Sequence, residues 1–375
     1  MTVAQKDATT AAEPEGTPTS ARAAPASATS YAFSTGTSAS LTSMSSGTTQ
    51  LVGAGSDDTA SAVTNIGFDF YFLGTRYTQF SASSNGYIRL GGTAVSTTQY
   101  TLGTASVPLI TALGSDLLVS STGKVHYKLL GSAPNRELVV EFLNMTIIYD
   151  GAGTSADGTY QVHLHESTGA IDFVYGSMNR NTSLGFNNAD NPQYIGFSTG
   201  NTAGTFVAVD TANTPSTSTL TANKFTTGAP MASLTSAADG ARRIYTFTPA
   251  TPTAPTSLSF SGVGIGGMTL NWVDSPDESL YAMYVSSDGS NYSFAGNAAQ
   301  NATSYVASGL APSTTYFWRV YAVSDGAFSA SLDGTQATGA PGNVTSTATG
   351  GPWSQAATWA GDRKSTRLNS SHRTV

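Results

Sequence analysis

Residues 66–90 read IGFDFYFLGTRYTQFSASSNGYIRL, and this stretch decides the fold of the first half of the chain. Alternate positions near its start hold four large apolar residues, Ile66, Phe68, Phe70 and Phe72. Because alternate residues of a β-strand share one face, this spacing places all four side chains on the same side. Asn85-Gly86 follows a second strand candidate and is typical of a hairpin turn, since both residues tolerate positive φ. The stretch predicts an antiparallel sheet with one buried face.

The same pattern continues outward to residues 31 and 250. Short apolar segments alternate with Gly, Ser, Asn and Pro turns, and helical periodicity is missing. Two hairpins are predicted, one joining residues 124–130 to 137–148 and the other joining 160–166 to 170–175. Strands this closely spaced predict an all-β fold, with residues 31–250 forming an antiparallel β-sandwich or jelly-roll domain.

Composition narrows the classes of function. Only 10% of the 375 residues are charged, and the formal net charge is −7, which argues against nucleic acid and anionic membranes as partners. The chain has no cysteine, which excludes a disulfide framework, a thiolate zinc site and a cysteine nucleophile. Apolar runs fall short of the ~18 residues that span a bilayer, so we expect no membrane insertion. Residues 1–30 lack the apolar block of a signal peptide, and their composition predicts disorder.

A second unit is predicted over residues 255–338, after a Pro/Thr-rich linker at 251–254. One of its strands ends on Trp272, and a later run carries Leu310, Pro312 and Tyr316. These residues resemble a fibronectin type III domain. The resemblance implies an immunoglobulin-like sandwich of seven strands and structural roles for these four residues. It also implies that Tyr316 is a tyrosine-corner residue, whose hydroxyl bonds back to the chain.

The first unit resembles a second family. The elements FDFYF and SSNGY of residues 68–87 are similar to the core of nidogen-like extracellular domains. Together with residues 131–141 and 166–175, they also resemble β-sandwich modules of large secreted surface proteins of Bacteroidetes-type bacteria. Such modules often precede fibronectin type III domains there, and they carry no catalytic motif. The resemblance implies an extracellular or cell-surface protein.

The end of the chain has two further features. Residues 339–361 comprise a linker and GGPWSQAATWAG, which resembles the opening of a further secreted β-module, so we expect the protein to continue past Gly361. Residues 362–372, DRKSTRLNSSH, resemble the in-frame translation of a sequencing adapter. We therefore treat residues 362–375 as an artefactual tail, with a natural basic tail as the alternative.

Histidines and acidic residues are the candidates for a metal site. His163 and His165 share one strand face and could begin such a site with His126 or Glu166. Glu166 points to the opposite side, however, and a zinc site needs three or four ligands. We therefore interpret His163 and His165 as part of a polar outer strand face, with their neighbours Val162 and Leu164 buried on the other face.

Acidic loops raise the question of calcium. Asp57-Asp58, Asp116 and the loop 150–157 hold carboxylates, but none matches a calcium-loop pattern. Turn capping by these side chains is the favoured interpretation, and a structural Ca²⁺ ion is the alternative. Beyond that ion, we expect no cofactor. Glu137 and Glu141 share a strand face as a carboxylate pair would, but nothing indicates a cleft, and we interpret them as solvent-side charges.

Sugar binding rests on aromatic residues. Tyr71, Tyr77 and Tyr87 could form a ligand platform on the outer face of a sheet, but we favour ordinary cross-strand pairing on a half-exposed sheet. Two hypotheses follow. The first is a non-enzymatic secreted or surface protein that acts as an adhesion or interaction module or a spacer, with an extracellular protein or glycan as partner. The second is a carbohydrate-binding accessory region of a larger secreted enzyme whose catalytic domain lies outside this chain.

Overall fold

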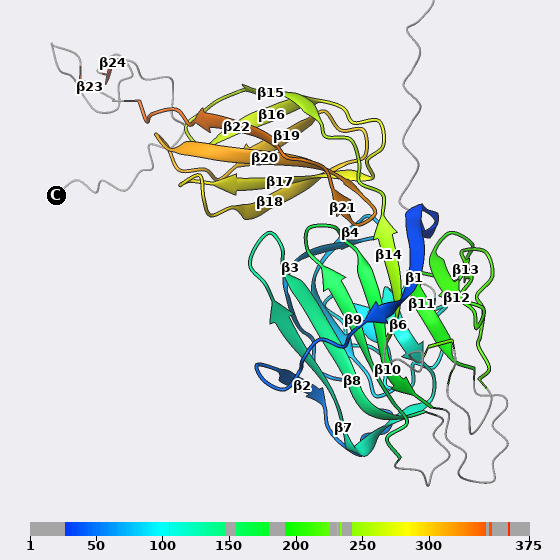
Figure 1. Cartoon of the computed structure of the whole chain (residues 1–375). Helices are drawn as coiled ribbons and strands as arrows, with labels where there is room; N and C mark the ends of the chain where they lie inside the picture. Colours follow the sequence, from blue (N-terminus) through cyan, green and yellow to red (C-terminus); the bar gives the residue numbers. More distant parts are fainter. Residues whose placement is uncertain are drawn as a thin grey trace, which may run out of the picture.

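The computed structural model describes residues 27–104, 106–147, 155–179, 192–225, 231, 233–234, 242–342, 345–346 and 359–360. The predictions for residues 1–26, for most of the loop 150–157 and for the tail after residue 361 lie outside these ranges. Within them the chain is almost entirely β-structure, with one 3₁₀-helix, η1 (Ala28–Ser30). None of the described helices is long and apolar enough to cross a membrane. Two sandwiches follow one another along the chain (Figure 1).

The N-terminal sandwich consists of two seven-stranded antiparallel sheets. The first sheet has the order β1 (Tyr31–Ala39), β14 (Arg242–Pro249), β10 (Ile171–Met178), β9 (Gly158–His165), β8 (Glu137–Ile147), β7 (Leu117–Leu130) and β2 (Thr49–Val52). The second has the order β13 (Pro215–Ser216), β12 (Phe206–Val209), β11 (Tyr194–Ser198), β6 (Leu109–Gly114), β5 (Ile88–Leu90), β4 (Thr75–Ala82) and β3 (Thr64–Phe72). The two predicted hairpins are the pairs β7–β8 and β9–β10.

The apolar row at the start of residues 66–90 builds the core between these sheets. Ile66, Phe68, Phe70 and Phe72 on β3 are all buried and belong to one hydrophobic cluster with residues from both sheets. The ring of Phe72 packs edge-on against Phe197 from β11, at 5.5 Å between centroids. The prediction of one buried sheet face is therefore confirmed.

The predicted turn at Asn85-Gly86 differs from a two-residue hairpin. Residues 83–87 form the connection between β4 and β5, closed by a bond from Ser83 N–H to the carbonyl of Tyr87. Only Gly86 has positive φ, and a Cβ there would lie 2.0 Å from the carbonyl oxygen of Leu113. Asn85 instead uses its side chain, which accepts from Leu117 N–H and donates to Asp58 and to the carbonyl of Thr97. Asn85 and Gly86 therefore belong to a wider loop, which the side-chain hydrogen bonds of Asn85 hold in place.

The C-terminal sandwich is smaller. One sheet contains β15 (Thr256–Ser261), β16 (Gly267–Val273) and β19 (Ser304–Ser308). The other contains β18 (Ser293–Ala299), β17 (Leu280–Ser286), β20 (Thr315–Ser324) and β21 (Ala327–Phe328), and β22 (Leu332–Ala337) also pairs with β20. Trp272 and Trp318 lie in its core, and Leu310 packs against it. A separate short pair joins β23 (Thr345–Ser346) and β24 (Trp359–Ala360).

The predicted tyrosine corner is present in the C-terminal sandwich. The Tyr316 hydroxyl accepts a hydrogen bond of 2.9 Å from the backbone N–H of Ala311. Pro312 lies exposed within the same turn, where its carbonyl accepts a bond from the Thr314 hydroxyl. The bonds hold the connection to β20 in place and support the fibronectin-like interpretation.

The segment between the sandwiches is tied to the second one. Thr253 donates its backbone N–H to Asp277 at 2.8 Å, and the Ser275 hydroxyl donates to the carbonyl of Thr253. Pro252 and Pro255 on either side are buried. The predicted linker is therefore short and docked along its length.

Candidate functional site

The larger sheet of the C-terminal sandwich turns its outer face toward the N-terminal sandwich. Along β17, Tyr281 and Met283 point into the core, so Ala282 and Tyr284 point outward. Along β20 the same alternation sends Arg319, Tyr321 and Val323 outward. An outer face with this many apolar and aromatic groups needs a cover, and the N-terminal sandwich supplies it.

Tyr71 on β3 is the centre of the contact. Its ring packs with Leu280, Ala282 and Val323 in a cluster that also includes Tyr284 and Phe328. The Tyr71 ring meets Phe328 edge-on at 5.1 Å between centroids. Its hydroxyl donates to Asn297 Oδ1 at 2.8 Å, so both the apolar body and the polar tip of the residue are satisfied by the second sandwich.

A second contact surrounds the turn between β20 and β21. The Asp325 side chain accepts from Ser27 N–H at 2.8 Å and from the Ser30 hydroxyl, while its carbonyl accepts from Gly74 N–H at 2.9 Å. Gly326 approaches so closely that a Cβ on it would lie 2.8 Å from the carbonyl oxygen of Tyr71. A Cβ on Gly169, in the β9–β10 turn, would lie 2.2 Å from the Gly326 carbonyl oxygen. Two glycines thus permit backbone-to-backbone contact between the sandwiches.

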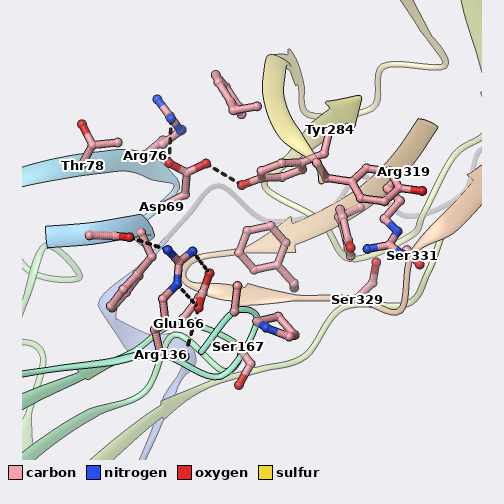
Figure 2. Close-up of a pocket in the computed structure, with 18 of the residues that line it drawn as sticks. Asp69, Arg76, Thr78, Arg136, Glu166, Ser167, Tyr284, Arg319, Ser329 and Ser331 are labelled. Atoms are coloured by element: carbon pink, nitrogen blue, oxygen red, sulfur yellow. Dashed lines mark hydrogen bonds and ion pairs between the residues drawn. The ribbon is translucent and has the colours of Figure 1, made fainter. Parts of the chain in front are cut away.

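Beside this contact the two sandwiches enclose a groove of about 890 Å³. Figure 2 shows Asp69 and Tyr284 on one side, Arg136 with Glu166 on another, and Arg319 with Ser331 at the far end. Aromatic rings line much of the wall, namely Phe68, Tyr284, Tyr292, Phe294, Tyr321 and Phe328. Small polar side chains complete it, namely Asn65, Thr78, Ser167, Ser290, Ser329 and Ser331. An aromatic wall with a few convergent polar groups is the usual composition of a binding site.

Both carboxylates of the groove are held by arginines. Asp69 accepts from Arg76 at 2.6 Å through one oxygen and from the Tyr284 hydroxyl at 2.7 Å through the other. Glu166 binds Arg136 through both oxygens, including a 2.7 Å bond from the arginine Nε. The hydrogen bond to Glu166 raises the pKa of Arg136, so this guanidinium stays charged. Each carboxylate of the groove is therefore held in place by an arginine of the N-terminal sandwich.

Burial and neighbouring charge also keep two tyrosines of the domain contact, Tyr284 and Tyr71, protonated. Burial is the largest cause that raises the pKa of Tyr284 far above its usual range, and Tyr71 and Asp69 add to it. Burial likewise raises the pKa of Tyr71. Both hydroxyls therefore act as hydrogen-bond donors at neutral pH, which suits binding and positioning.

The histidine prediction is confirmed in part. Val162 and Leu164 are buried in the core, so His163 and His165 do lie on the outer face of β9. His163 bonds Glu137 at 2.5 Å, and His165 bonds Asp172 at 2.9 Å. Each imidazole is therefore paired with a carboxylate of a neighbouring strand, and Glu137 also lies 4.0 Å from His165.

This outer face is covered, which corrects the interpretation of its acids as solvent-side charges. The segment between β1 and β2 crosses the sheet (Figure 1), where Thr42 exchanges two hydrogen bonds with Gln161, each 2.8 Å long. Glu141 is 5% exposed and bonds His126 at 2.6 Å and Gln161 at 2.8 Å. The result is a ladder of paired polar groups across four strands. The sequence alone could not reveal this ladder, because its residues come together only when the strands pair.

The acidic candidates do meet in space. Asp57, Asp58 and Asp116 can bring their carboxylate oxygens within 4.8 Å of one another. Burial is the main cause that raises the pKa of Asp116 to about 6, with Asp57 and Asp58 contributing. Both oxygens of Asp58 already accept from the Tyr100 hydroxyl. Because Ca²⁺ takes six to eight oxygens, these three carboxylates alone do not define a calcium site, and we assign no ion to them.

The burial of Tyr71 and Tyr87 contradicts the alternative of an exposed tyrosine platform. Tyr71 is 1% exposed and lies in the contact between the sandwiches, and Tyr87 is 0% exposed and belongs to a buried cluster. Tyr77 is half-buried and packs against the main core. Tyr71 and Tyr87 do point away from the main core, but other parts of the chain cover the faces on which they lie. The aromatic residues that line the groove, such as Tyr292 and Phe294, belong to the C-terminal sandwich, and no sequence motif marks them.

Comparison with known proteins identifies both sandwiches. The family model described as NIDO related matches residues 30–249, and the fibronectin type III model matches residues 253–335. No curated protein matches the chain. The fibronectin type III domain of human collagen XX is 27% identical over 23% of this chain and 91% of that chain, with a TM-score of 0.21. A Fn3-like protein from Clostridium thermocellum is 25% identical over 25% of this chain and 98% of that one, with a TM-score of 0.22. The NIDO-related match spans more than half of the sequence, so this chain belongs to the NIDO-related family and carries a fibronectin type III domain after the family's β-sandwich.

Proposed function

We propose that the chain is a non-enzymatic, secreted or cell-surface module that serves in adhesion, in interaction or as a spacer. The observation that carries this proposal is the bonded contact between the two domains. Tyr71, Asp325 and Gly326 tie them together through apolar packing, hydrogen bonds and backbone contact. A spacer or an interaction module needs its parts held at a fixed angle, and this contact provides that property.

The chemistry of the groove favours binding over turnover. Its two carboxylates are paired with Arg76, Arg136 and Tyr284, and burial raises the pKa of Tyr284 far above its usual range. The partner is an extracellular protein or glycan that rests against the joined domains.

Two measurements on the whole protein test this proposal. Intact cells that produce it are treated with a protease that cannot enter them, and loss of the protein while a cytoplasmic marker survives is the expected result. Small-angle X-ray scattering of the purified chain should fit a single arrangement of residues 31–337. Protection inside the cell would overturn the location, and scattering that requires many interdomain angles would overturn the spacer role.

The second candidate is a carbohydrate-binding accessory region of a larger secreted enzyme. The aromatic wall of the groove favours it, because partly exposed rings such as Tyr292 and Phe294 offer apolar faces to sugar rings. Its test is direct measurement of saccharide binding to the groove.

A further inference from the structure

The groove between the domains has an unusual charge for this protein. The chain carries a net charge of −7, yet three arginines, Arg76, Arg136 and Arg319, lie around one groove with only two lining carboxylates. The cations therefore exceed the anions on this wall, opposite to the balance of the whole molecule. An anionic ligand would be attracted here and repelled by most of the remaining surface.

Arg319 has the loosest partner of the three. Its Nε is buried, lies 3.7 Å from Asp333, whose side chain is 58% exposed, and has no hydrogen-bond partner. The guanidinium lies 3.9 Å from the centre of the Tyr292 ring, which holds its plane at the groove wall. The Arg319 side chain is 37% exposed, so its guanidinium can meet a planar carboxylate, the group that arginine binds through two parallel hydrogen bonds.

The neighbouring rings extend the site along the wall. Tyr292 and Phe294 come from the β18 side of the sheet and Tyr321 from β20, and all three are partly exposed. Phe294 is itself covered on one side by Arg76, at 3.7 Å from the ring centre. Alternating aromatic faces and arginines match a ligand that alternates apolar ring faces with carboxylates.

We propose that this groove binds an acidic oligosaccharide, a chain of sugar rings that carry carboxylate groups. Tyr292, Phe294 and Tyr321 stack on the ring faces, and Arg319 binds a carboxylate. Small side chains such as Ser290 and Thr78 lie within reach of sugar hydroxyls on the same walls. This inference rests on the proposed function, because it names the class of partner that an interaction module of this kind would take.

Calorimetric titration of the full chain at low salt tests the proposal, with a galacturonic acid pentamer as the probe. We expect it to bind at least tenfold more tightly than the fully methyl-esterified pentamer, which keeps the rings and loses the charges. Arg319→Ala should weaken binding of the acid form at least tenfold. Ser290→Glu should also weaken it by adding an anion to the wall, since the Ser290 side chain makes no contact that the fold needs. Arg89→Ala is the matched control, since Arg89 lies outside the groove and bonds only the carbonyl of Ala94.

Several results would overturn the proposal. They are failure of the pentamer to bind, equal binding after esterification, and undiminished binding by Arg319→Ala. Tighter binding of a polyglutamate peptide would replace the saccharide with an acidic peptide. Scattering from the same samples separates the two proposals. A single interdomain arrangement without saccharide binding rejects the ligand alone, whereas multiple arrangements reject the proposed function.

Discussion

Tyr284 of the fibronectin type III domain donates its hydroxyl to Asp69 of the NIDO-related domain across 2.7 Å. The other oxygen of Asp69 accepts from Arg76, and the Arg76 guanidinium in turn lies over Phe294 of the fibronectin type III domain. One carboxylate thus links strands from both domains at the edge of the groove. The domain contact and the candidate binding site share these residues, so a change in one should be measurable in the other.

Tyr284→Phe should weaken the contact between the domains by about 1–2 kcal/mol. The substitution removes the hydroxyl and leaves one oxygen of the half-buried Asp69 without its donor. Two of the four tryptophans, Trp272 and Trp318, are buried in the core of the fibronectin type III domain, so their exposure during urea unfolding changes the tryptophan fluorescence. We expect its midpoint to fall. Tyr292→Phe, on the same sheet face, is the control and should leave the midpoint in place, and an unchanged midpoint for Tyr284→Phe would contradict this account.

Gly326→Ala should loosen the domain contact by about 1–3 kcal/mol, because the added methyl group would overlap backbone atoms. The new Cβ would lie 2.8 Å from the Tyr71 carbonyl oxygen and 3.0 Å from the Tyr31 hydroxyl. We expect a larger radius of gyration in X-ray scattering, with both domains still folded. Gly264→Ala makes the same chemical change in the same domain where the nearest atom is 3.8 Å away, and it should not alter the scattering. Equal scattering profiles for the wild type, Gly326→Ala and Gly264→Ala would show that Gly326 does not contribute to the domain contact.

The polar ladder predicts that the stability of the fold depends on pH through the protonation of His165. Burial lowers the pKa of this imidazole, but its bond to Asp172 and the charge of Glu137 raise it overall. A raised folded-state pKa stabilises the fold below the ordinary histidine value and loses that effect as pH rises through the raised value. His165→Gln should therefore lower the melting temperature more at pH 5.5 than at pH 8.5. NMR titration of Asp172→Asn should place the His165 pKa lower than in the wild-type protein, and no change would refute the pairing.

Substitution of Asp116 should raise the melting temperature relative to the wild type as the pH increases, whereas substitution of His165 should lower it at acidic pH. Burial, with Asp57 and Asp58 nearby, raises its pKa to about 6, so the folded state holds a proton that the unfolded state has already lost. Its favourable contribution is complete below about pH 4 and is lost as pH rises through 6. Relative to the wild type, Asp116→Asn should therefore gain melting temperature between pH 4 and pH 7.5. A constant difference across this range would show that the pKa of Asp116 is not raised in the folded protein.

Local pattern was sufficient to predict much of the fold. Period-two spacing placed Phe68, Phe70 and Phe72 in the core, and the predicted hairpins formed because short turns leave few alternatives. Tyr316 was predictable because the tyrosine corner is a local contact between the hydroxyl and Ala311, five residues away.

Contacts between distant residues could not be predicted in the same way. Tyr71 was assigned to an outer face because its strand alternates, but that face is covered by a domain more than 200 residues later in the chain. The ladder of His126, Glu141 and His163 depends on strand register, and its cover depends on the path of residues 40–48. The groove draws on both domains, so no continuous motif encodes it.

The most direct test of the central claim measures the distance between the two domains in solution. The chain has no cysteine, so Asn135→Cys and Thr335→Cys, both exposed and one in each domain, can be spin-labelled as a unique pair. Pulsed electron paramagnetic resonance of the full chain should give one narrow distance distribution, which broadens when Gly326→Ala is added. A broad or multiple distribution in the pair without Gly326→Ala would contradict a fixed two-domain unit and, with it, a preformed groove between the domains.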